Sequence, residues 1–527
     1  MKLNKVYLPV FLAMAIALGM VIGGKLDYNS GTAGLFGANS KKEKLNRLID
    51  YIDFEYVDDI NTDSIVEVTV NGILENLDPH SVYIPPQEVA EIEESMRGDF
   101  VGIGVSFYAY RDSVAVIQAI SGGPSDRVGI RGGDRIVYAN GQSLVGNSLT
   151  DDSLTSILKG KVDTPVSLVV KRRGADELLN FKLKRSVVPI QSVDASYMLT
   201  DSLGYVKINR FAESTHKEFE KALQSLRAQG ATQIALDLRN NPGGYISAAE
   251  KVADEFLKKD KLILFTKNKS GKKEETFATR KGTFEDAEVF VLINENSASA
   301  SEIVAGAIQD NDKGLIVGRR SFGKGLVQRE MALGDGSAVR LTIARYYTPT
   351  GRSIQRPYGN GNKAYFNDYL DRYKNGELNS VDSIQVADSL KFRTPLGKIV
   401  YGGGGIIPDV FVAKDTNFEL ETLNYALRSG FMARFVFELL EEDRPYYNSL
   451  SLAEFKEEIE ISDENMKDFL SFAADRNFKI SLSQYQETLK RYIKATMAQQ
   501  LFGNNVFEQM LNEYDPVIEK VIALSKS

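Results

Sequence analysis

The chain has no cysteine and only two histidines, His80 and His216, among its 527 residues. Without cysteine it can form no disulfide, thiolate zinc site, catalytic thiol or lipid anchor attached at cysteine. It also has no HExxH pattern or other cluster of metal-ligand residues, which argues against a metal-dependent hydrolase. Ser-His-Asp chemistry would need one of the two histidines, and we expect His216, near a helix start, to be exposed rather than catalytic.

The chain also lacks an excess of basic residues. It has 64 Lys and Arg against 71 Asp and Glu, a net charge of −7, without a basic domain. A nucleic-acid partner is therefore not expected. A hydrophobic content of 43% with 10% aromatics predicts packed cores, and the length predicts about three folded units.

Charge is nearly absent from one stretch at the N-terminus. Lys2 and Lys5 precede the apolar run 6–24, "VYLPVFLAMAIALGMVIGG". Nineteen residues suit one membrane span and are long for a signal-peptide core, which favours an uncleaved anchor. The lysines predict that residues 41–527 lie outside the cytoplasm, on the periplasmic side of an inner membrane. The alternative is a cleaved signal followed by secretion.

The patterning predicts an α/β core that carries a small β module and a helical extension. Short strands and glycine turns replace a helical pattern at about residue 97, and strand-helix alternation begins at Gly204. A polar, aromatic segment ending in "GGGG" looks like an insertion. The predicted parts are an anchor or signal with linker at 1–40, helices at 41–96, the β module at 97–186, the core at 187–414 with an insertion at 357–404, and helices at 415–527.

The stretch 317–328, "VGRRSFGKGLVQ", contains a lysine that can be interpreted in three ways. A phosphate-binding P-loop needs Ser or Thr after Lys324, where Gly325 stands, and a helix where a β-hairpin is predicted. A Ser321-x-x-Lys324 pair needs a helix, which the glycines flanking the lysine disfavour. The third interpretation makes Lys324 the general base for a serine elsewhere.

Residues 289–310, "VFVLINENSASASEIVAGAIQD", provide that serine. The pattern predicts a buried strand, a tight turn and a helix whose first N–H groups could stabilise an oxyanion. Ser297, Ser299 and Ser301 compete for the role, and geometry alone does not separate them. A lysine base requires burial or a cationic neighbour to lower its pKa by several units.

"NENSASASE" followed by "GRRSFGKGLVQ" closely resembles the C-terminal processing peptidases, or tail-specific proteases. The resemblance covers roughly residues 45–356 and 406–410. It implies that Ser299 is the nucleophile, that Lys324, 25 residues later, is the base, and that Gln328 positions the lysine. It also implies a crotonase-like peptidase core.

Two further blocks carry the resemblance. In "ALDLRNNPGG" it implies an oxyanion hole formed by the backbone of Gly243 or Gly244 with the N–H of Ala300. The β module resembles a PDZ domain, whose N–H groups would receive a substrate's terminal carboxylate while a strand edge pairs with the peptide. A PDZ domain could also gate the active site. The implied carboxylate-binding residues are Gly102, Ile103, Gly104 and Val105.

These observations together predict a membrane-anchored serine endopeptidase that recognises protein C-terminal tails, uses a Ser-Lys pair and needs no metal or organic cofactor. The rival from another class is a catalytically inactive PDZ scaffold that binds tails at the membrane, and a crotonase-related enzyme is a third possibility. Expected partners are proteins with accessible C-termini, the membrane, and a second copy in a homo-oligomer. Glu302 is as consistent with an N-terminal helix charge as with a mechanistic role, and Asp237 could form a salt bridge with Arg239 or orient a loop.

Overall fold

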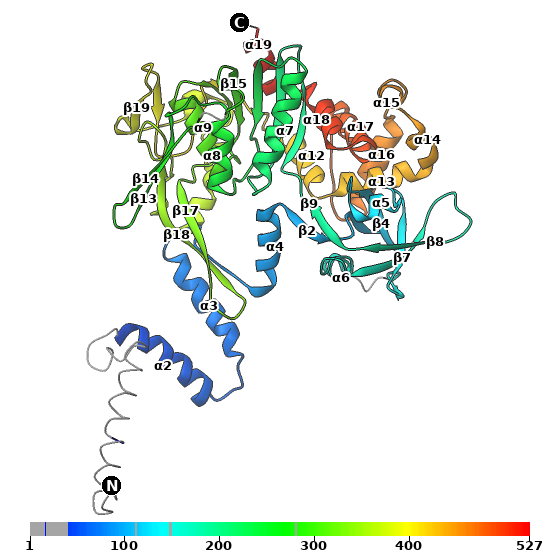
Figure 1. Cartoon of the computed structure of the whole chain (residues 1–527), viewed down its shortest axis with the longest axis horizontal. Coiled ribbons are helices and arrows are strands. Elements are labelled where there is room, and N and C mark those ends of the chain that lie inside the picture. The colour runs from blue at the N-terminus through cyan, green and yellow to red at the C-terminus, as the bar shows by residue number, and fades with distance from the viewer. Residues whose placement is uncertain (1–15, 17–39, 111–112, 147–149, 280–281, 527) are drawn as a thin grey trace, which may run out of the picture. The chain divides into compact units, whose positions relative to one another are not determined.

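A computed structural model describes residues 16, 40–110, 113–146, 150–279 and 282–526 (Figure 1). The chain forms two units, residues 1–77 and 78–527. The first contains α2 (Ser40–Glu55) and α3 (Thr62–Glu75). The predicted anchor, 6–24, lies outside the described residues except for Ile16. Among the helices that are described, none has the length and apolar character needed to cross a bilayer.

The second unit is built around a six-stranded sheet. Its strands alternate with helices along the chain, as predicted, and all neighbouring pairs are parallel except the first. The strand order is β10 (Val193–Met198), β11 (Leu203–Ile208), β12 (Gln233–Asp237), β15 (Glu288–Ile293), β16 (Gly314–Gly318) and β21 (Val410–Phe411).

Helices cover both faces of this sheet, which is why its central strands read as continuous apolar runs. One face packs against α7 (Thr215–Ala228), α8 (Ile246–Asp254) and α9 (Ala300–Asp310). The other face packs against the last helix, α19 (Pro516–Leu524). Because parallel strands end at one edge, the loops after β12, β15 and β16 are brought close together.

A second sheet carries the hairpin predicted after Lys324. Strand β17 (Leu326–Ala332) pairs antiparallel with β18 (Ala338–Tyr347). The remaining strands are β1 (Val82–Ile84), β13 (Leu262–Asn268) and β14 (Lys273–Phe277). The P-loop interpretation is thereby wrong, because a strand and not a helix follows the lysine.

The predicted β module follows α4 (Pro86–Arg97) and has its own apolar core. In its sheet, β3 (Val105–Tyr110) is an edge strand next to β4 (Ser113–Ala119). A helix, α6 (Asp151–Leu158), interrupts the strands of this module. The other elements are β2 (Asp99–Gly102), α5 (Pro124–Arg127), β5 (Arg135–Ala139), β6 (Gln142–Ser143), β7 (Pro165–Lys171), β8 (Leu179–Lys184) and β9 (Ser186–Pro189).

The insertion at 357–404 is compact rather than extended. It forms α10 (Asn362–Phe366), α11 (Asp368–Lys374), the short 3₁₀ turns η4 (Val381–Ser383) and η5 (Asp388–Leu390), and the hairpin of β19 (Lys391–Arg393) and β20 (Ile399–Tyr401).

The C-terminal region is helical, as predicted, and its helices run from yellow to red in Figure 1. Its core is rich in phenylalanine, including Phe435, Phe455 and Phe469. The helices preceding α19 are α12 (Phe418–Arg428), α13 (Phe431–Glu442), α14 (Arg444–Ser449), α15 (Leu452–Glu458), α16 (Asp463–Ala474), α17 (Gln486–Phe502) and α18 (Asn504–Asn512).

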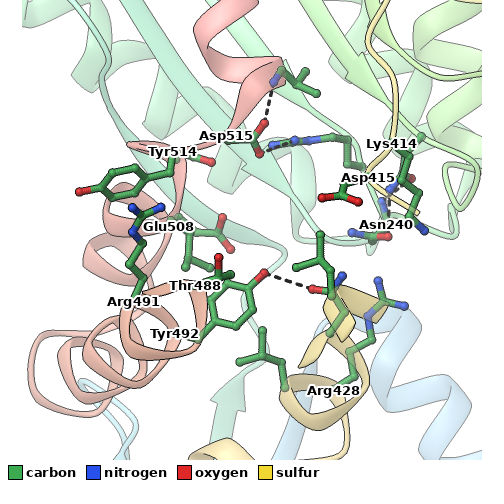
Figure 2. A pocket seen from close by; sticks show the side chains of 18 of the residues that line it. Asn240, Lys414, Asp415, Arg428, Thr488, Arg491, Tyr492, Glu508, Tyr514 and Asp515 are labelled. Atoms are coloured by element: carbon green, nitrogen blue, oxygen red, sulfur yellow. Dashed lines mark hydrogen bonds and ion pairs between the residues drawn. The ribbon is translucent and has the colours of Figure 1, made fainter. Parts of the chain in front are cut away.

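A cavity of about 1010 Å³, lined by both polar and apolar residues, lies between α12, α13, α17 and α18 and the carboxyl ends of the core strands. Figure 2 shows Asn240, which follows β12, on one side and Tyr492 and Arg491 of α17 on the other. Asp515 closes part of the wall through an ion pair with Arg239, with 2.6 Å between Oδ2 and Nη1.

Candidate active site

Ser299 lies in the turn that joins β15 to α9, directly before the first helical residue. Its backbone has φ 53° and ψ −112°, a conformation that a residue with a side chain adopts only at a cost of about 1–3 kcal/mol. The serine is half-buried, whereas Ala300 beside it is fully buried. This strained turn presents the side chain at a helix N-terminus, where the first N–H groups have no partner within the helix.

The two competing serines are held in structural hydrogen bonds. The fully buried Ser297 hydroxyl donates to the carbonyl of Leu238 at 2.8 Å. The equally buried Ser301 hydroxyl donates to the carbonyl of Asn241 at 3.0 Å. Both therefore fix the turn to the neighbouring loop after β12, which leaves Ser299 as the partly accessible serine of the three.

The loop after β12 brings Gly243 against Ser299. A side chain on Gly243 would lie 2.8 Å from Ser299 Cβ and 2.9 Å from the Ala300 nitrogen, and Gly243 has φ +104°. Its own N–H donates to Asn241 Oδ1 at 2.9 Å. A side chain on Gly244, whose φ is +146°, would instead meet the Phe211 carbonyl, and the oxyanion donor beside Ala300 stays a prediction for Gly243 or Gly244.

Lys324 enters the site from the loop between β16 and β17. Its Nζ donates to Gln328 Oε1 at 3.0 Å, the contact that the predicted role of Gln328 requires. The Gln328 amide nitrogen in turn donates to the carbonyl of His80, which orients the amide oxygen toward the lysine. Burial, aided by the charge of Arg340, lowers the pKa of Lys324, while Glu302 and Asp78 oppose that shift.

Glu302 joins the two halves of the site. Its fully buried carboxylate accepts the N–H of Ser299 at 2.9 Å and of Lys324 at 2.8 Å. It also accepts the N–H of Gly323 at 2.7 Å and the hydroxyl of Ser321 at 2.5 Å. Burial raises the pKa of Glu302, and these four donors work against that shift. The interpretation as a helix charge was incomplete, because most of its donors lie on another loop.

Tyr346 of β18 connects the same two residues through their carbonyls. Its hydroxyl lies 3.1 Å from the Ser299 oxygen and 2.8 Å from the Lys324 oxygen. Together with the Glu302 carboxylate, it fixes the main chain on both sides of the proposed pair. The pattern offered one signal for Glu302, its three-residue spacing from Ser299, and none for Tyr346.

His80 also contacts the site, although its sequence context showed little sign of a catalytic role. Its Nε2 lies 2.8 Å from the Tyr365 hydroxyl, and its carbonyl holds Gln328. Burial and the nearby Lys324 charge lower the pKa of His80 to about 4, so its ring is neutral at pH 7. Its main chain, rather than its imidazole, connects it to the lysine.

The other predictions fall outside this site. His216 is half-buried rather than exposed, and its Nε2 lies 2.9 Å from Glu255 Oε1. The expected pair of Asp237 with Arg239 is present at 2.6 Å. In the β module, Gly102, Ile103, Gly104 and Val105 connect β2 to β3, with Gly104 at φ +73°. They stand at the start of the sheet's edge strand, where a peptide could add as a further strand.

The sequence profile of peptidase family S41 matches residues 202–360, and a PDZ domain profile matches residues 101–183. A third profile, of a family of unknown function, matches residues 422–503 in the helical region.

Two similar curated proteins are the carboxy-terminal-processing protease of Bartonella bacilliformis and the carboxy-terminal processing protease CtpB of Bacillus subtilis. The first is 34% identical over 306 residues, 57% of this chain and 69% of that protein. The second is 33% identical over 318 residues, 60% of this chain and 65% of that protein. The matches thus span about two thirds of each relative.

Among solved structures, the photosystem II D1 C-terminal processing protease is 27% identical, with a TM-score of 0.37 over 71% of this chain and 87% of that one. With its S41 core, its PDZ module and a relative matched over 69% of its length, the chain belongs to the C-terminal processing peptidases of family S41, which are serine proteases.

Proposed function

We propose that this chain is an endopeptidase in which Ser299 is the nucleophile, Lys324 the general base and Gln328 the residue that holds the base. The observation that carries the proposal is the position of Lys324. Its amine is half-buried and bonded to Gln328, and its backbone N–H shares the Glu302 carboxylate with that of Ser299. Such a lysine loses its proton more readily than an exposed one.

The reaction follows from these positions. Ser299 Oγ attacks the scissile carbonyl while its proton passes to the neutral Lys324 Nζ. The N–H group of Ala300, with that of Gly243 or Gly244, stabilises the oxyanion that forms. The lysine ammonium then returns the proton to the departing amine, which leaves an acyl-enzyme. Water, deprotonated by the same lysine, hydrolyses that ester and regenerates the serine.

The substrate class is proteins with accessible C-terminal tails. The support is the edge strand β3 and the glycine-containing turn before it, which suit binding of an extended peptide with its carboxylate at the turn. A tail peptide with a free carboxylate should bind the full chain at least about tenfold more tightly than its C-terminal amide. Equal affinity would remove the carboxylate-binding role from this turn.

For location, the apolar run 6–24 behind Lys2 and Lys5 supports an inner-membrane anchor with the catalytic part in the periplasm. Digestion of the chain by a protease added to spheroplasts, but not to intact cells, is the expected result. Resistance in spheroplasts would place the catalytic part in the cytoplasm.

The catalytic proposal is tested by cleavage of an unstructured protein by the full chain and its Ser299→Ala and Lys324→Ala variants. Both variants should lose at least about 10³-fold in turnover, while Ser270→Ala and Lys258→Ala, at exposed positions, should match the parent. Wild-type cleavage by either active-site variant contradicts the pair. Loss in His216→Ala would instead indicate serine-histidine chemistry, and tail binding without turnover by the parent would indicate the inactive scaffold.

A further inference from the structure

The insertion 357–404 lies directly against the loop that carries Lys324. Arg372 of α11 donates through Nη1 to the carbonyls of Arg320 and Ser321, at 3.0 and 2.9 Å. Through Nη2 it donates to the carbonyl of Phe322 at 3.3 Å. One guanidinium thus holds three consecutive carbonyls, ending two residues before the lysine.

Burying the Arg372 guanidinium at this position costs free energy. Only 2% of Arg372 is exposed, and its main carboxylate neighbour, Asp368, lies 2.7 Å from Nε. Burying a cation costs several kcal/mol in desolvation, and an apolar residue of similar size often packs at least as stably. An apolar residue, however, has no N–H donors with which to hold the three carbonyls in one arrangement. The contact therefore suits a role in holding the loop rather than in general stability.

A second contact fixes the beginning of the same loop. The Arg320 guanidinium meets both oxygens of Glu377 at 2.5 and 2.6 Å, and it donates to the carbonyl of Gly404 at 2.6 Å. Glu377 and Gly404 both belong to the insertion, and the Glu377 side chain is only 5% exposed. The loop is therefore bonded to the insertion at three successive residues, from Arg320 to Phe322.

A third contact leads from the insertion to Gln328. The Phe322 ring lies 4.0 Å from the guanidinium of Arg356, which also lies 3.9 Å from the ring of Tyr365 in α10. The Tyr365 hydroxyl reaches His80, whose carbonyl orients the Gln328 amide. The insertion thus supports both the loop that carries the base and the group that binds its amine.

We infer that the insertion 357–404 is a brace that keeps the Lys324 loop in its closed arrangement, with Arg372 as a positioning residue for the base. This inference rests on the proposed Ser-Lys mechanism. Loosening the brace would admit water to the amine and weaken its contact with Gln328. The charged or titratable groups around Lys324 in the described part of the chain are Arg340 and Tyr346 of β18, Glu302 of α9, and Asp78 and His80 before β1, and none of these belongs to the insertion.

The test is the pH dependence of kcat/KM for the full chain and its Arg372→Gln and Glu377→Gln variants. A less buried lysine has a higher pKa, and only its neutral form is active, so the acid limb should move to higher pH. A displacement of one pH unit lowers kcat/KM about tenfold at any pH below the limb. Arg393→Gln, in the same insertion but exposed and bonded only within its hairpin, should leave the profile unchanged.

A second readout does not depend on turnover. Competitive labelling with acetic anhydride over a range of pH, followed by mass spectrometry, reports the Lys324 amine in the Ser299→Ala background. We expect labelling of Lys324 to start at higher pH when Arg372→Gln or Glu377→Gln is added. Glu377→Gln decides the question if Arg372→Gln does not fold.

Unchanged acid limbs and unchanged labelling in the variants overturn the brace. That result is distinct from failure of the proposed function, which would appear as full activity in Lys324→Ala. Altered labelling with an unaltered acid limb would also overturn the inference, since the lysine would then be braced without controlling the rate.

Discussion

Lys324 and Gln328 meet through one hydrogen bond of 3.0 Å, and the direction of that bond is set from outside the pair. The carbonyl of His80 takes the amide N–H of Gln328, so only the amide oxygen can face the lysine. A neutral oxygen accepts from the amine without adding the negative charge that would keep it protonated. Glutamine at this position therefore orients the base while leaving its pKa low.

Gln328→Glu should raise the pKa of Lys324, because a carboxylate beside the amine stabilises the ammonium form. Activity requires the neutral amine, so the acid limb of kcat/KM should move to higher pH and activity near pH 7 should fall about tenfold for each unit of that move. The measurement is the pH–rate profile beside that of Gln224→Glu, an exposed control. A limb that stays in place or moves to lower pH would count against Gln328 as the partner of the base.

Gly243 has no room for a side chain. A methyl group there would lie 2.8 Å from Ser299 Cβ and from the Ala298 carbonyl, so Gly243→Ala must displace the nucleophile turn. We expect kcat to fall at least about 100-fold, the usual cost of misplacing a reacting group by about 1 Å. Gly351→Ala is the matched control, with a similar φ of +87° and open space around the methyl position. Equal losses of kcat in the two variants would mean that backbone strain, and not displacement of the Ser299 turn, causes the effect.

At this scale the family resemblance proposes Ser299, Lys324 and Gln328, and the structure brings the last two into hydrogen-bond contact. Reasoning about geometry from the sequence alone did not decide which of Ser297, Ser299 and Ser301 is the nucleophile. The hydrogen bonds of Ser297 and Ser301 to the loop after β12 separate them, and such contacts between loops some 60 residues apart have no local pattern. The hydrogen bond from the Gly243 N–H to the Asn241 side chain could not be predicted from the sequence either.

At the scale of elements, the strand-turn-helix over 289–310 and the hairpin after Lys324 follow from hydrophobic periodicity and glycine placement. Hydrophobic periodicity does not show how the strand-turn-helix and the hairpin contact each other. The Glu302 carboxylate on α9 takes three donors from the loop before β17, so the two elements share one buried charge. In the sequence, Glu302 can be explained simply as a charge in the first turn of a helix. That explanation gives no sign that Glu302 also binds the loop before β17.

Glu302→Gln should lower the free energy of unfolding by about 3 kcal/mol, because one amide oxygen cannot serve four donors and its NH₂ group would face an N–H. Urea unfolding measures the effect. Glu519→Gln removes an exposed acidic residue from the first turn of α19 and should cost less than about 1 kcal/mol. Similar values for both variants would reduce Glu302 to a helix-terminal charge.

At the scale of the whole molecule, the helical region outside the S41 match contacts both the peptidase core and the PDZ module. In the helical region, Glu508 of α18 pairs with Lys207 of β11 at 2.7 Å, and Asp515 pairs with Arg239. In the PDZ module, Tyr108 of β3 meets Phe437 of α13 edge to face, with 5.4 Å between ring centroids. The sequence predicts each of these parts from its own local pattern. Their contacts join residues some 300 positions apart, and local patterns carry no information about such distant contacts.

Glu508→Gln should destabilise the second unit by about 2 kcal/mol, because it leaves the largely buried Lys207 without a carboxylate. The matched control, Glu513→Gln, weakens an exposed pair of 3.8 Å and should change stability by less than about 0.5 kcal/mol. The midpoint of urea unfolding reports both. Identical midpoints for parent and Glu508→Gln would mean that this contact does not join the helical region to the core.

The central claim is that Lys324 activates Ser299. Its most direct test is the rate at which a fluorophosphonate labels Ser299 in the full chain, followed by intact mass across a range of pH. The wild type should gain one label on Ser299, at a rate that rises as Lys324 loses its proton, and Lys324→Ala should be labelled at least about 100-fold more slowly at every pH. Labelling of Lys324→Ala at the wild-type rate, or on a residue other than Ser299, would contradict the account.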